Sequence, residues 1–126
     1  MVRLKVLLES CPEGVCVCGG SLIASQWVVT AGHCVFWEGE ITSKDVMTLF
    51  LGDHEYSIKE EKEKQMKVKQ IILHEDYYDY RLLNDIALLK LEVKVNLNMY
   101  TPICLPKVGD DFTDQTAWAY GICAGF

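Results

Sequence analysis

The sequence has no apolar run that approaches the ~18 residues of a membrane-spanning helix. It also lacks a basic excess, because 12 Lys and Arg residues stand against 18 Asp and Glu residues, giving a net charge of −6. This balance argues against nucleic acid or an anionic membrane as the main partner. There are no internal repeats and no low-complexity linker, and 126 residues correspond to one domain.

Cysteine, in contrast, is abundant, with six residues in the chain. An even and high count favours disulfides formed in an oxidising compartment, because cytosolic thiols stay reduced. Cys16 and Cys18 lie too close for the C-x2-C spacing of a zinc site, and no second Cys/His pair follows at zinc spacing. We therefore predict disulfides rather than a metal site, and an extracellular location.

Short apolar segments separated by turn residues predict an all-β chain. Residues 1–8 alternate apolar and charged side chains, which is typical of a strand and not of a signal peptide, so we expect that signal to be absent from this chain. The charged stretch 60–69 has no apolar stripe and predicts a loop that runs into a strand. Further strands are predicted at 22–23 and 27–30 as a hairpin, at 46–51, at 66–73 and, buried on both faces, at 86–91.

Three blocks of sequence carry a specific resemblance. They are CGGSLIASQWVVTAGHC at 18–34, NDIALLKL at 84–91 and PICLP at 102–106. In this order and at this spacing, they resemble the histidine block, the aspartate block and the inter-barrel segment of the trypsin-like (chymotrypsin-fold) serine proteases. The resemblance implies one six-stranded antiparallel Greek-key barrel over 1–100. It also implies a connector and the start of a second, incomplete barrel over 101–126.

The resemblance also implies roles for single residues. His33 would be the general base of a Ser-His-Asp triad, Asp85 would accept a hydrogen bond from its far ring nitrogen, and Cys18 would form a disulfide with Cys34. Gly32 is a departure, since relatives mostly carry Ala there. The partners of the other four cysteines stay open. Cys11 and Cys16 would close a small hairpin in one arrangement, and Cys104 and Cys123 would pair with each other, bond another chain or stay reduced.

No serine lies in the Gly-Asp-Ser-Gly-Gly-Pro block that supplies the nucleophile in this family. The serines of the chain are Ser10, Ser21, Ser25, Ser43 and Ser57. Residues 117–121 resemble the first strand of the second barrel, and 122–126 resemble a segment that relatives carry much later. We therefore expect a truncated or spliced form that is inactive as this chain, with an uncovered apolar face that makes the monomer prone to aggregate.

Besides a small β-domain that is stabilised by disulfides and unrelated to this family, two functions remain open. One is a part or isoform of a secreted endopeptidase whose longer form cleaves protein or peptide substrates. The other is a non-catalytic homologue that binds a protease partner or an inhibitor.

Apart from one calcium site, no cofactor is expected. The stretch 52–63 aligns without gaps on the calcium loop of some relatives. Its carboxylates would come from Asp53, Glu60 and Glu63, and its carbonyl oxygens from Glu55 and Ile58, because calcium prefers six to eight oxygen ligands. The alternative is an acidic, solvated loop whose charge is offset by neighbouring lysines.

Overall fold

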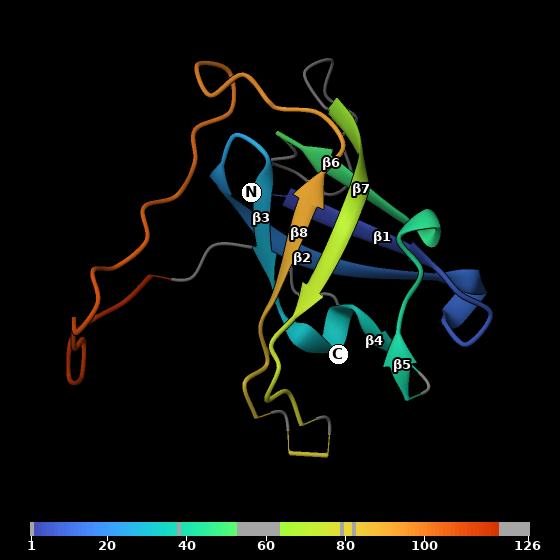
Figure 1. Cartoon of the computed structure of the whole chain (residues 1–126), viewed down its shortest axis with the longest axis horizontal. Coiled ribbons are helices and arrows are strands. Elements are labelled where there is room, and N and C mark those ends of the chain that lie inside the picture. The colour runs from blue at the N-terminus through green and yellow to red at the C-terminus, as the bar shows by residue number, and fades with distance from the viewer. Residues whose placement is uncertain (1, 38, 53–63, 79, 82, 119–126) are drawn as a thin grey trace.

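The computed structural model describes residues 2–37, 39–52, 64–78, 80–81 and 83–118. Within them, six strands form a closed barrel and two more form a small separate sheet (Figure 1). The barrel strands are β1 (Val2–Leu7), β2 (Val15–Ala24), β3 (Trp27–Thr30), β6 (Met47–Leu51), β7 (Lys64–Leu73) and β8 (Ala87–Leu91). The small sheet pairs β4 (Phe36–Trp37) with β5 (Glu40–Ile41). Three single-turn 3₁₀ helices lie between strands: η1 (Pro12–Gly14), η2 (Gly32–Cys34) and η3 (Lys44–Val46).

The barrel closes in the order β1-β2-β3-β8-β7-β6, and every neighbouring pair is antiparallel. The two non-sequential pairings, β3 with β8 and β1 with β6, are those of a Greek-key arrangement. Closure leaves no strand edge exposed in the barrel. The predicted fold class, an all-β chain with a six-stranded antiparallel barrel, is confirmed.

Alternation along the strands fills the barrel interior. In β1, Val2, Leu4 and Val6 point inward and are almost fully buried, because successive side chains of a strand face opposite sides. The same alternation in β8 buries Leu89 and Leu91 but leaves Lys90 half-buried. The prediction that this strand is buried on both faces is therefore wrong, since a single closed barrel has only one dry side.

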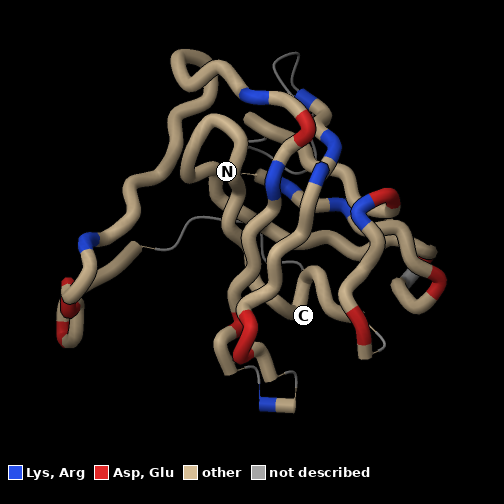
Figure 2. Tube along the Cα trace, in the orientation of Figure 1, with Lys and Arg blue, Asp and Glu red and all other residues tan. Residues whose placement is uncertain are grey.

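Charge is divided between the strands and their connections (Figure 2). All charged residues on the barrel strands are basic: Arg3, Lys5, Lys64, Lys67, Lys69 and Lys90. Several of them lie along the barrel wall, with the Arg3 guanidinium 4.6 Å from the centre of the Phe50 ring and the Lys67 ammonium donating to the Thr48 hydroxyl at 3.2 Å. The acidic residues that the structure describes lie outside these strands, so the negative net charge is carried by the connections.

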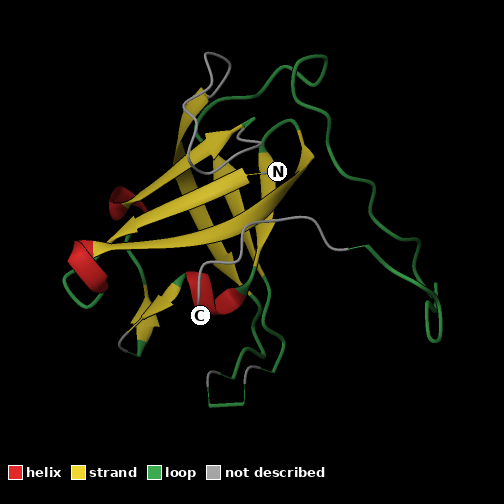
Figure 3. Cartoon of the chain, turned by 180° about the vertical axis from the view of Figure 1, so that it is seen from behind, coloured by secondary structure: helices red, strands yellow, loops and turns green. Residues whose placement is uncertain are grey.

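After β8 the chain leaves the barrel as an extended tail, defined here as residues 92–118 (Figure 3). No strand or helix forms in this tail. Two backbone hydrogen bonds hold its first half against the β2–β3 hairpin, from Val95 to the Ser25 carbonyl at 2.7 Å and from Ile103 to the Leu22 carbonyl at 2.8 Å. The assignment of 101–126 to a connector and second-barrel remnant stays a prediction. No helix in the described part of the chain has the length and hydropathy needed to cross a bilayer.

Candidate functional site

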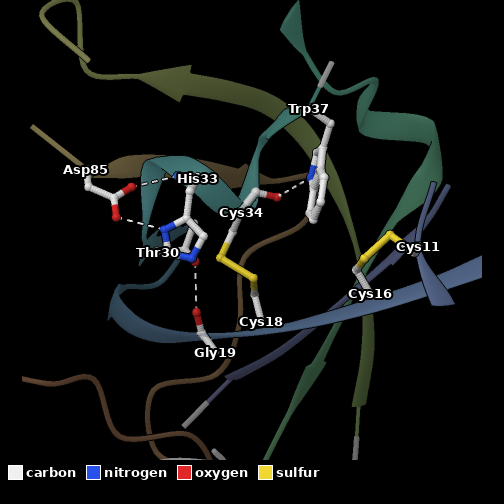
Figure 4. The surroundings of a disulfide bond; sticks show 9 residues. All are labelled: Cys11, Cys16, Cys18, Gly19, Thr30, His33, Cys34, Trp37 and Asp85. Atoms are coloured by element: carbon white, nitrogen blue, oxygen red, sulfur yellow. Dashed lines mark hydrogen bonds and ion pairs between the residues drawn. A yellow bond between two sulfur atoms is a disulfide. The ribbon is translucent and has the colours of Figure 1, made fainter. Parts of the chain in front are cut away.

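His33 lies in the single turn η2, which follows β3 directly. Two links tie this turn to the neighbouring strand β2. The Thr30 hydroxyl donates to the Gly19 carbonyl at 2.8 Å, and the Cys18–Cys34 disulfide joins the residue after His33 to the same strand (Figure 4). The backbone of His33 is therefore fixed from both sides.

Asp85 lies at the end of the connection between β7 and β8 and precedes β8 by two residues. The preceding residue, Asn84, has a left-handed φ of 53° that Asn tolerates better than most residues. Its side-chain amide donates to the Asp76 carbonyl at 3.0 Å, and the His74 amide donates to the Ile86 carbonyl at 3.1 Å. These hydrogen bonds link the two ends of the connection. Asp85 lies next to the end of β3, because Thr30 in β3 pairs with Ala87, two residues after Asp85.

The structure brings His33 and Asp85 together through two hydrogen bonds (Figure 4). The backbone amide of His33 donates to Oδ1 of Asp85 at 2.7 Å, and Nδ1 of the ring lies 2.7 Å from Oδ2. A carboxylate only accepts hydrogen bonds, so the ring proton belongs on Nδ1 and the lone pair of a neutral imidazole on Nε2. The side chains are 35% and 23% exposed, so the pair lies in a partly sheltered position at the surface.

The described residues contain two disulfides, Cys18–Cys34 and Cys11–Cys16. The second of these closes the turn around η1. Cys104 is exposed and forms no disulfide, and Cys123 lies outside the described residues. One nitrogen of His33 and the sulfurs of the first disulfide lie within 4.8 Å of one another, but both sulfurs are bonded to each other and offer no thiolate to a metal.

The residues proposed for calcium, Asp53, Glu55, Ile58, Glu60 and Glu63, fall outside the described residues, as does Ser57. The structure therefore leaves that prediction untested.

Two of the remaining serines have structural contacts. The side chain of Ser43 accepts a hydrogen bond from the Asp45 amide and caps η3, and the carbonyl of Ser25 accepts from Val95. Ser21 lies within β2, and Ser10 lies in the turn before η1.

Sequence reasoning missed the aromatic side chain that packs against Gly32, the residue before His33. Tyr77 lies in the connection that carries Asp85, and its ring centre is 5.3 Å from that of Phe36 in β4. It also lies against Gly32, where a methyl group would come within 2.8 Å of the ring. The sequence feature that could have indicated a close approach here is Gly32, where relatives mostly carry Ala.

The family model described as Trypsin matches residues 6–123, which is most of the chain. The chain belongs to the trypsin-like serine protease family. The resemblance of its three sequence blocks is thereby confirmed.

Individual relatives agree with this assignment. Serine protease SSP1 of Scolopendra subspinipes is 38% identical over 122 residues, 96% of this chain and 42% of SSP1. Coagulation factor XI of Bos taurus is 37% identical over 110 residues, 82% of this chain and 17% of the factor. Trypsin-1 of Gadus morhua is 36% identical over 95 residues, 75% of this chain and 36% of the trypsin.

Among solved structures, that of GrC aligns with a TM-score of 0.70 and 30% identity, over 87% of this chain and 44% of GrC. The chain thus spans less than half the length of these relatives.

Proposed function

We propose that this chain supplies the general base, His33, and the orienting acid, Asp85, of a secreted serine endopeptidase, and that the chain by itself does not hydrolyse peptide bonds. The observation that carries the proposal is the double hydrogen bond between the two residues, at 2.7 Å each. It fixes both the position and the tautomer of the imidazole, which is the arrangement that a general base requires.

The chemistry would follow the family mechanism. Nε2 of His33 takes the proton of a serine hydroxyl while the serine oxygen bonds to the peptide carbonyl carbon. His33 then gives this proton to the leaving amine as the C–N bond breaks, and water releases the acyl group by the same proton path. Asp85 stabilises the imidazolium that exists between the two steps, since its carboxylate accepts from Nδ1.

The chain supplies no recognisable nucleophile for these steps. None of its five serines lies in a Gly-Asp-Ser-Gly-Gly-Pro block, which in the family also provides the oxyanion hole. The chain covers 17–42% of the curated relatives. In this proposal, the serine, the substrate pocket and the substrates belong to a longer form of the protein. The two disulfides support an extracellular location for that protein.

A fluorophosphonate probe, which labels activated serines, tests this proposal. We expect no labelling of the purified chain under conditions in which bovine trypsin reacts fully, and no difference between the chain and its His33→Ala variant. Labelling of one defined serine that disappears in the His33→Ala variant would show that the nucleophile is present after all.

A second function has one observation in its favour. The tail exposes large apolar side chains, among them Trp118 at 82%. Such exposure is typical of a surface that another protein covers. A non-catalytic homologue that binds a protease or an inhibitor would fit it. Sequencing the transcript separates the two: an in-frame Gly-Asp-Ser-Gly-Gly-Pro block further along supports the endopeptidase, and a stop codon after Phe126 in a secreted product supports the binding protein.

Calcium binding by the 52–63 stretch is part of the proposal and is tested by titration calorimetry. We expect heat on addition of calcium to the folded chain, and a loss of that heat in a Glu60→Gln/Glu63→Gln variant. A calcium titration without heat would remove calcium from the account.

A further inference from the structure

The outer face of the barrel carries four lysines, which we call the lysine face: Lys5 in β1, Lys67 and Lys69 in β7, and Lys90 in β8. Lys67 and Lys69 are exposed, and the other two are half-buried. The barrel strands, as the structure bounds them, contain no Asp or Glu, and Figure 2 shows blue segments along them and red segments on their connections. The lysine face therefore has a local charge opposite to the net charge of the chain.

The register of the strands places the four lysines beside one another. Thr48 in β6 pairs with Lys5 on one side and with Lys67 on the other. Neighbouring strands lie about 4.8 Å apart, so these two lysines are separated by roughly 10 Å across the sheet. Lys69 directly precedes the residue that pairs with Lys90. The lysine face thus extends without interruption over four neighbouring strands.

The charges of the lysine face are not neutralised by the part of the chain that the structure describes. None of its members forms an ion pair there; Lys67 donates to the neutral Thr48 hydroxyl at 3.2 Å, and the Lys90 ammonium lies 5.6 Å from the centre of the Trp27 ring. Glu92 is the acidic neighbour, since its amide donates to the Lys67 carbonyl at 3.1 Å. Like charges on adjacent strands repel one another, so a ligand with several anionic groups would relieve that repulsion.

The surroundings of these lysines favour a charged polymer over a protein partner. The barrel is closed, so a peptide finds no free strand edge to pair with. Protein interfaces depend on apolar and aromatic anchors, but the two aromatic rings on this face are covered by cations. Arg3 lies 4.6 Å from the centre of the Phe50 ring, and Lys90 lies over Trp27. Lysine ammonium groups act as hydrated point charges, which suits a flexible ligand with many separate anionic groups.

We propose that the lysine face binds a sulfated polysaccharide through the sulfate groups of several successive sugars. The two disulfides favour an oxidising, extracellular compartment, where polymers of this class occur. The net charge of −6 does not prevent this binding, because charges beyond about 8–10 Å are largely screened at physiological salt. The proposed site goes beyond the role of His33 and Asp85 and does not depend on it.

The test is equilibrium binding of the full 126-residue chain to immobilised heparin, measured by surface plasmon resonance. We expect the wild type to bind at low salt and to bind more weakly as salt is added. Lys67→Gln/Lys69→Gln should weaken binding by at least about tenfold, because each cation near an anionic surface contributes to affinity. Glu92→Gln should strengthen binding by about twofold or more, since it removes a negative charge beside Lys67.

Arg81→Gln/Lys107→Gln is the matched control. It removes the same number of positive charges, from the β7–β8 connection and from the tail. It should weaken binding by less than about twofold, because both charges lie outside the lysine face. Circular dichroism checks the fold of each variant. His33→Ala should bind heparin like the wild type, so failure of this proposal and failure of the proposed catalytic base are distinguishable.

Soluble competitors identify the chemistry that is bound. Heparin should displace the chain, and desulfated heparin should not. The proposal is overturned if the wild type does not bind, if the lysine variant and its control lose affinity equally, or if desulfated heparin competes as well as heparin. Equal competition by poly-glutamate or duplex DNA, at equal concentration of charge, would overturn the choice of a sulfated polysaccharide.

Discussion

The barrel and the tail of this chain differ in how far their apolar side chains are exposed to solvent. In the barrel, apolar side chains alternate with polar ones and nearly all of the inward-facing ones are buried. In the tail, apolar residues are less frequent and lie mostly exposed, as with Ile103, Leu105 and Trp118. The difference shows that closure of the sheet buries the apolar side chains of the barrel, whereas the extended tail leaves most of its own in solvent.

Core and tail leucines should therefore differ most in their effect on stability. Leu89 is fully buried in β8, whereas Leu105 is 61% exposed in the tail. We expect Leu89→Ala to lower the free energy of unfolding by about 2–5 kcal/mol, through lost burial and a cavity. Leu105→Ala should change it by less than about 0.5 kcal/mol. Urea unfolding followed by circular dichroism measures both, and equal losses would show that the tail is part of the cooperative core.

The disulfides sharpen the comparison within the barrel itself. Cys18 and Cys34 are 16 residues apart, and Cys11 and Cys16 are 5 apart. A cross-link restricts the unfolded chain more when it closes a longer loop. For the loop of 16 residues between Cys18 and Cys34, the stabilisation is about 3 kcal/mol. We expect the Cys18→Ser/Cys34→Ser variant to lose more stability than the Cys11→Ser/Cys16→Ser variant, with thermal unfolding as the measurement. The reverse order would point to strain or to structure in the unfolded chain.

The difference between the regular barrel strands and the rest of the chain also explains which features could be predicted from the sequence. The barrel strands follow from alternation, and the location of His33 and Asp85 follows from family blocks that lie at strand ends. The sheet of β4 and β5 was missed because two-residue strands carry no periodic signal. The contact between Gly32 and Tyr77 was missed as a contact because it joins segments that only the folded barrel brings together.

The smallest effect belongs to the second half of the tail, at a turn that is closed by local hydrogen bonds. The hydroxyl and the backbone amide of Thr113 both donate to the Asp111 carboxylate, at 2.5 and 2.9 Å. These bonds, the side-chain one first, lower the pKa of Asp111 because they favour its charged form. Thr113→Ala should raise that pKa toward the ordinary value and leave barrel unfolding unchanged. Carboxyl ¹³C titration measures it, with Thr116→Ala as a control that should show no change, and a pKa unaffected by Thr113→Ala would show that this turn does not form.

The central claim is that the barrel assembles a base and its orienting acid within this chain. It is tested most directly by ¹⁵N NMR of the His33 ring in the wild-type chain and in Asp85→Ala. The account predicts a protonated Nδ1 with a downfield proton in the wild type, and loss of that proton signal with a mixed tautomer in Asp85→Ala. A mixed tautomer already present in the wild type, or a downfield proton that survives in Asp85→Ala, would contradict it.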